Sequence, residues 1–169
     1  MYVFGKKLAP PEKRGITDRS FLAGCPGTIA SLFAYWDSKR GERTMPRRAD
    51  IDPLDFHGHL PGILLVDVEG EDARRAGIFR YRVVGTAEVE LRGHDPTGRL
   101  VQEGFLGPSL KDVLACYELV RRRRTFLYDP LGYWTPEGRW VDEHTLFLPL
   151  SNDGDTVTQI LVYSETRTD

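Results

Sequence analysis

The chain has 169 residues, of which 40% are apolar, 28% charged and 11% aromatic. This length and composition are typical of one globular domain, and they exclude a sensor joined to a kinase or any two-domain enzyme. The net charge of -2 gives no overall bias toward nucleic acid or an anionic membrane, so a partner would have to recognise a local patch.

Two further features predict a cytoplasmic protein. Residues 1–7 lack the apolar core of a secretory signal, and no apolar run is long enough to cross a bilayer. Cys25 and Cys116 are the only cysteines, and their wide separation favours two reduced thiols over a disulfide or a pair of metal ligands. We therefore expect a cytoplasmic location and no membrane contact.

The first forty residues divide into an arm and a helix. Residues 1–25 mix proline, glycine and charge without apolar periodicity, which predicts a partly ordered N-terminal arm before a single domain at 26–169. Within that domain, Thr28 can cap a helix in which Leu32, Phe33 and Trp36 follow at helical spacing. The pattern indicates an amphipathic helix with an aromatic stripe that ends at Gly41.

A hairpin and two helices should follow. Residues 62–69 and 78–84 are apolar or alternating runs joined by a polar turn, which predicts an antiparallel hairpin with Phe79, Tyr81 and Val83 on its covered face. Residues 87–92 form a short helical segment. The longest helix should begin after the capping residue Ser109 and end in the arginine run 121–124.

The last 45 residues predict three strands, at 125–134, 139–150 and 157–164. The first contains proline and glycine, which is typical of an edge strand. In the second, Leu146, Leu148 and Leu150 share one face, whereas Glu143 points to the other face with Thr145 and Phe147.

Two strands, a helical crossover and three more antiparallel strands follow the element order of the PAS fold. Several strings strengthen the likeness when taken in chain order: Tyr35-Trp36, MPRRADIDP at 45–53, FRYRVVGT at 79–86, GHDPTG at 93–98 and LPLSNDG at 148–154. Together they closely resemble a family of small stand-alone bacterial PAS-domain proteins, common in alphaproteobacteria, with no assigned enzymatic activity. The resemblance covers residues 30–165 and implies an α+β fold, a five-stranded antiparallel sheet with helices packed on one face, preceded here by the N-terminal amphipathic helix.

The resemblance implies a non-catalytic sensory or regulatory module that acts by binding a small ligand, a protein partner or both. An apolar pocket between sheet and helices would be lined by Phe79, Tyr81, Tyr117 and Leu146, although plain core packing explains the same residues. Without an output domain in the chain, a signal should leave through a surface. We expect Leu32, Phe33 and Trp36 to form it, as a homodimer interface or a site for a partner protein.

We predict no metal or bound cofactor, although an unidentified small-molecule ligand fits the fold. Neither cysteine lies in the Asn-Cys-Arg-Phe context of a flavin photoadduct, and none of the four histidines lies on a helix suited to an axial haem ligand. The histidines and cysteines also lack the spacing of metal ligands.

An enzymatic alternative depends on Asp142 and His144. They lie two residues apart on one predicted strand, so their side chains share a face and can form an acid-base pair in a small enzyme or carrier. This alternative requires the pair to converge inside a cavity. The basic stretches 39–48 and 121–124 could contact phosphate, but arginines at a helix end commonly complement its dipole, so we expect no nucleic-acid binding.

Overall fold

The computed structural model describes residues 2–3, 6–7, 9–134 and 137–167, so the rest of the predicted arm and the last two residues of the predicted domain lie outside it. The molecule is built on a five-stranded antiparallel sheet in the order β4-β3-β7-β6-β5. Its strands are β3 (Ile63–Glu71), β4 (Gly77–Val84), β5 (Leu127–Trp134), β6 (Trp140–Leu150) and β7 (Gln159–Arg167). A small separate pair joins β1 (Tyr2–Val3) to β2 (Lys6–Lys7). The predicted α+β class and five-stranded antiparallel sheet are confirmed.

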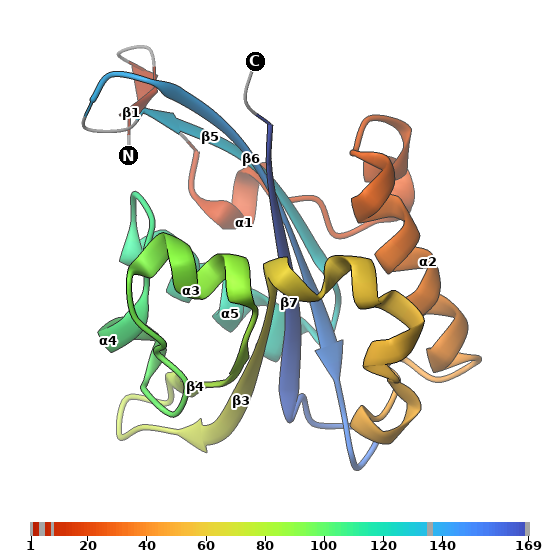
Figure 1. Ribbon diagram of the computed structural model, residues 1–169. Helices are drawn as coiled ribbons and strands as arrows, with labels where there is room; N and C mark the ends of the chain where they lie inside the picture. The colour runs from red at the N-terminus through yellow and green to blue at the C-terminus, as the bar shows by residue number, and fades with distance from the viewer. Residues whose placement is uncertain (1, 4–5, 8, 135–136, 168–169) are drawn as a thin grey trace.

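Helices cover both faces of the sheet (Figure 1). One face carries the crossover helices α3 (Thr86–Arg92), α4 (Val101–Gly104) and α5 (Leu110–Arg123), with α1 (Pro11–Arg14) packed against α5. The other face carries α2 (Gly27–Arg40) and the 3-10 segment η3 (Pro53–Gly62). Two further 3-10 segments are η1 (Arg19–Ala23) and η2 (Arg48–Asp50). Helix α2 and segment η3 thus form a second layer on the sheet.

Strand alternation divides the interior into two hydrophobic clusters. On β6, Phe147 joins the cluster under α5, whereas Leu146 and Leu148 join the cluster under α2. Successive side chains of a strand point to opposite faces, so a sheet covered on both sides needs apolar residues at consecutive positions. The fully buried end of β6, residues 146–150, meets that requirement.

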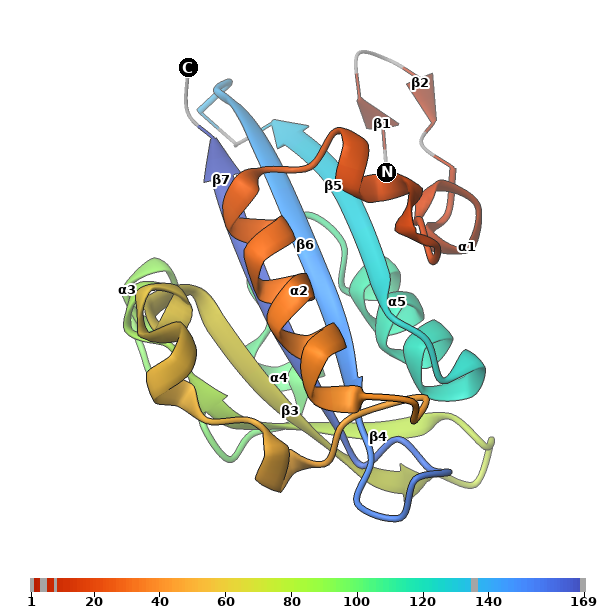
Figure 2. The same ribbon diagram turned by 90° about the vertical axis from the view of Figure 1, so that its right-hand side faces the viewer.

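The aromatic stripe of α2 is part of this second cluster. Leu32, Phe33 and Trp36 are no more than 2% exposed, and Trp36 Nε1 donates a hydrogen bond to the Pro149 carbonyl at 2.9 Å. Figure 2 shows α2 running along β6. The prediction that these three side chains form an interaction surface is therefore wrong, because the chain's own sheet already covers them. Homodimerisation itself stays a prediction.

The covered face of β4 is interrupted by a bulge. Leu65 pairs with Val83, but the next residue, Val66, pairs with Tyr81, so one extra residue is inserted in β4. A one-residue insertion reverses the side on which the following side chains point. Phe79 and Tyr81 are buried as predicted, whereas Val83 is 47% exposed and lies on the other face.

The segment before α2 packs closely on the sheet. Ile16 and Tyr128 exchange two backbone hydrogen bonds at the edge strand β5, and Phe21 is buried with its ring stacked 5.0 Å from that of Tyr128. None of the helices in the described ranges is long and apolar enough to span a membrane.

Candidate functional site

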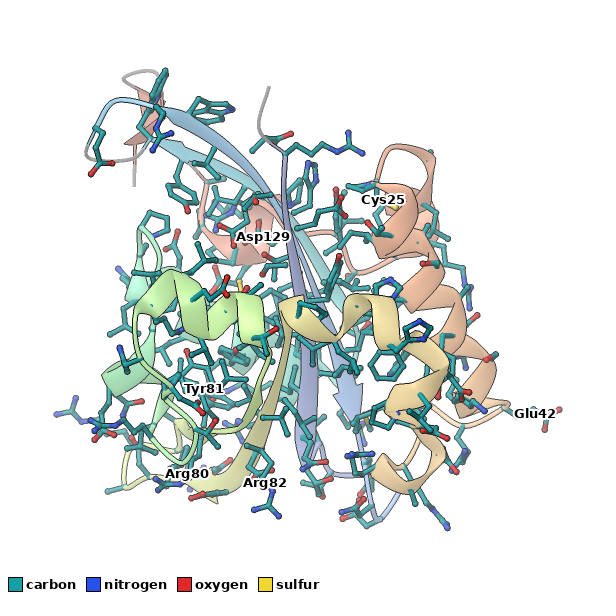
Figure 3. The ribbon with its side chains drawn as sticks, in the orientation of Figure 1. Cys25, Glu42, Arg80, Tyr81, Arg82 and Asp129 are labelled. Atoms are coloured by element: carbon teal, nitrogen blue, oxygen red, sulfur yellow. The ribbon has the colours of Figure 1, made fainter. Side chains whose placement is uncertain are left out.

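A cavity of about 80 Å³ lies between the sheet and helices α3 and α5. Every strand of the sheet contributes to its wall, and one part of that wall is apolar, with Leu64, Phe105, Val113, Leu131, Phe147 and Val162. The polar part contains Arg14, Glu88, Arg92, Asp112, Asp129, Glu143, Thr145 and Ser164. Tyr81 on β4 and Asp129 on β5 lie on this side of the sheet (Figure 3). An apolar wall with a few convergent polar groups is the usual form of a small-molecule site.

Two of the four predicted pocket residues line this cavity. Tyr81 and Tyr117 are in its wall, and Phe79 lies behind them with its ring 5.2 Å from that of Tyr117. Leu146 is misplaced in the prediction, because it points from β6 toward α2 on the opposite face. The residue that takes its place in the wall is the next one along the strand, Phe147.

Arg14 forms one edge of the site. Its guanidinium binds Asp129 through two hydrogen bonds of 2.9 and 3.0 Å, and it donates a third, of 2.9 Å, to Asp112. Asp129 is only 5% exposed, so this forked pairing is what allows a carboxylate to be buried there. Burial alone would lower the pKa of Arg14, but the two carboxylates outweigh it and raise the pKa.

Arg92 forms a second ion pair on the α3 side. It lies 2.6 Å from Glu88 and donates to the carbonyl of Gly104 at 2.9 Å, and its side chain is only 3% exposed. The guanidinium carbon also lies 5.6 Å from the centre of the Tyr81 ring. Both arginines of the cavity are thus fully engaged by groups of the protein.

Glu143 differs from the other charged groups of the wall. Its hydrogen bond from Thr145 Oγ1 is long, at 3.4 Å, and Thr145 itself lies 3.0 Å from the Ser164 hydroxyl. Among the residues that the structure describes, no arginine, lysine or histidine forms an ion pair with it. Burial, reinforced by the nearby charge of Glu88, raises the pKa of Glu143 to about 7. The strand pattern correctly groups Glu143 with Thr145 and Phe147 on one face of β6, but the prediction put the pocket on the opposite face, with Leu146, and so left Glu143 out of the site.

The thiol of Cys116 and the phenol of Tyr117, which also line the cavity, stay neutral. Burial raises the pKa of the Cys116 thiol and of the Tyr117 phenol, and the neighbouring carboxylate of Asp129 acts in the same direction on Cys116. Cys116 Sγ lies 3.6 Å from Asp129 Oδ2. A thiol held protonated beside a carboxylate is a poor nucleophile, so Cys116 acts as a small buried side chain.

The raised pKa of Glu143 should make stability depend on pH. The folded protein holds this proton up to about pH 7, whereas the unfolded chain releases it near the ordinary value of 4.5. Between these values the folded state binds more protons, so the free energy of unfolding falls as pH rises. Glu143→Gln lacks this proton, so the free energy of unfolding of the variant minus that of the wild type should increase by about 3 kcal/mol from about pH 5 to about pH 8. Urea unfolding at each pH measures this difference. A wild-type-minus-variant difference that stays constant over this range would contradict the assignment.

Asp142 and His144 do form the expected pair, but away from the cavity. His144 Nε2 lies 3.1 Å from Asp142 Oδ2, and His144 Nδ1 lies 2.6 Å from the Tyr128 hydroxyl. Strand alternation puts the pair on the α2 side of β6, and neither residue is in the cavity wall. The convergence inside a cavity that the enzymatic alternative requires is not found at this site.

The basic stretches are largely paired with carboxylates. Arg43 binds Asp50 at 2.8 Å, and Arg124 binds Asp155 at 2.6 Å. Other pairs join Arg40 to Asp37 and both Arg121 and Arg122 to Glu118. Pairing of this kind reduces the positive field that a phosphate backbone would need.

Comparison with known proteins agrees with this architecture. A family model described as "PAS domain" matches residues 26–163. None of the curated proteins matches the sequence.

Solved structures resemble the chain at low identity. The PAS domain of the fruit-fly ELK potassium channel has a TM-score of 0.46 and 14% identity, over 69% of this chain and 94% of that one. The light-state LOV domain of the blue-light photoreceptor Aureochrome1 has a TM-score of 0.45 and 9% identity, over 68% and 88% of the two chains. The photo-excited blue-light photoreceptor Vivid has a TM-score of 0.45 and 11% identity, over 79% and 93%. With most of its length matched by the family model, this chain belongs to the PAS-domain family.

Proposed function

We propose that this protein is a sensory or regulatory module that binds a small ligand in the cavity between the sheet and α5. The observation that carries the proposal is the position of Glu143, whose largely buried carboxyl group faces the cavity and has no cationic partner among the described residues. Burying an ionisable group without a partner costs free energy, which a ligand that pairs with it would recover.

We further propose that the N-terminal segment reports whether the cavity is occupied. Arg14 joins α1 to Asp112 on α5 and to Asp129 on β5, and both carboxylates also line the cavity. A ligand that displaces either carboxylate would change how strongly this segment is held. The chain continues from α1 through η1 into α2, so a homodimer or a partner protein could sense the change there.

Thermal unfolding with a panel of small polar compounds tests ligand binding. We expect some compound to raise the melting temperature of the wild type, because a ligand at 100 times its Kd stabilises the folded state by about 2.7 kcal/mol. Val113→Phe, which places a ring in the cavity wall, should abolish the response. Val83→Phe is the matched control, because Val83 is exposed on the other face and should leave the response unchanged.

Native mass spectrometry of protein purified without added cofactor complements this panel, since a retained ligand and the oligomeric state both appear in one spectrum. If a compound raises the melting temperature of Val113→Phe as much as that of the wild type, it binds outside the cavity. A cavity that takes no compound, in a protein made more stable by Val113→Phe, would show a simple packing void.

A further inference from the structure

The charged groups of the cavity wall differ in whether they have a partner of opposite charge. Arg14 is held by two carboxylates, and Arg92 is held by Glu88 and by the backbone carbonyls of Glu88 and Gly104. An anionic ligand would have to break one of these buried ion pairs, which is costly because it leaves a carboxylate uncompensated. Among the described residues, the wall therefore offers no unpaired cation to a negative group.

Hydrogen-bond acceptors, in contrast, are available around Glu143. Its carboxylate lies beside the hydroxyls of Thr145 and Ser164, which are 3.0 Å apart. A protonated primary amine carries three N–H donors and no acceptor. One carboxylate and two hydroxyl oxygens on adjacent strands match those three donors, and an ionised pair of this kind makes the stronger class of hydrogen bond.

The surrounding charges favour a cation as well. The charged side chains that face Glu143 across the cavity are Arg14 from α1, Glu88 and Arg92 from α3, Asp112 from α5 and Asp129 from β5. With Glu143, four carboxyl groups surround two guanidinium groups, so the wall has an excess of negative charge. The neutral titratable groups nearby are Tyr81, Cys116, Tyr117 and Tyr133.

The shape and lining indicate an organic cation with a short apolar part. No group of three histidine, cysteine or acidic side chains among the described residues converges in the manner of a metal site. The apolar part of the wall, with Phe105, Val113 and Phe147, suits carbon rather than hydrated metal. A cavity of roughly 150 Å³ accommodates benzene, so 80 Å³ admits a smaller molecule, with about three or four carbons.

We infer that the cavity selects a small primary amine, bound as its ammonium form by the carboxylate of Glu143 and the hydroxyls of Thr145 and Ser164. This inference rests on the proposed function, because it names the class of ligand for the same cavity.

Three probes of equal length separate the class of ligand from binding itself: n-propylammonium, n-propanol and propionate, each titrated calorimetrically into the full chain. An alkylamine stays protonated below about pH 10, so pH acts mainly on Glu143, whose carboxylate is about one-tenth ionised at pH 6 and nine-tenths at pH 8. We expect n-propylammonium to bind about ten times more tightly at pH 8 than at pH 6.

Variants assign the binding to the three acceptors. Glu143→Gln keeps the shape of the side chain and should lose both the affinity, by at least about ten-fold, and its pH dependence. Ser164→Ala should weaken binding by a smaller factor. Glu165→Gln is the matched control, because Glu165 follows Ser164 on β7 and alternation directs it to the other face. It should bind the amine as the wild type does.

The outcomes separate the inference from the proposed function. If propionate or n-propanol binds as tightly as the amine, the ligand class is wrong and ligand binding in the cavity stands. Amine binding that persists in Glu143→Gln also overturns the inference. If none of the three probes binds and the compound panel gives no response either, both proposals fall together.

Discussion

Replacing Arg14 with methionine is expected to lower the free energy of unfolding by about 3 to 5 kcal/mol, as measured by urea denaturation. The substitution removes the cation but keeps an unbranched apolar stem of similar length. It removes the two hydrogen bonds that Arg14 donates to Asp129, which is only 5% exposed, and the one that it donates to Asp112. A buried carboxylate that loses its cation keeps the full cost of dehydration, and this is the source of the large effect.

Arg19→Met is the matched control for this change. Arg19 also binds an aspartate, Asp37, through two hydrogen bonds of 2.9 Å, but its side chain is exposed. Water and salt screen exposed ion pairs, so Arg19→Met should be nearly neutral in its effect on the free energy of unfolding. If both variants lose only a little free energy of unfolding, the Arg14 ion pairs do not hold the N-terminal segment on the sheet.

Phe33→Ala should cost about 3 to 5 kcal/mol, because it empties a large space between α2 and the sheet. The Phe33 ring packs edge-on against Phe21 at 5.1 Å and Phe126 at 4.8 Å, and it also contacts Trp36. Such a loss is the signature of a core residue. An interface residue would instead change the oligomeric state when truncated and leave the protomer stable.

Leu54→Ala serves as the control for Phe33→Ala. Leu54 is 77% exposed, so its truncation should change the free energy of unfolding by less than about 0.5 kcal/mol. Size-exclusion chromatography with light scattering should be run on both variants. If Phe33→Ala unfolds like the wild type and only its molecular mass in solution changes, α2 is an interaction helix after all.

The edge of the candidate site lies outside the region that defines the family. The family model begins at residue 26, whereas Arg14 reaches the cavity from the segment before it. The family region by itself contains the buried carboxylate of Asp129 but not the arginine that pairs with it. The N-terminal segment is therefore part of the site and not only a tail.

The sequence by itself determined the order and most of the bounds of the five sheet strands and of helices α2, α3 and α5, but not the short elements before α2. Alternation identified β4 and β6, and Ser109 caps α5 as predicted, with its hydroxyl accepting a hydrogen bond from the Asp112 amide. The motifs that resemble PAS proteins then led to the correct sheet. These features depend on local chemistry, namely periodicity, caps and turns, which a single sequence carries in full.

Only the tertiary structure decided which face of the sheet would hold the cavity of the candidate site. Alternation correctly separated Leu146 from Glu143, but it could not say which set would meet α5 and which would meet α2, because both faces of this sheet are covered. The bulge that turns Val83 outward depends on the register with β3, and the partner of Asp129 lies 115 residues away along the chain, at Arg14. Such long-range pairings arise when separate elements pack, so the stretches of chain that contain them carry no local sign of them.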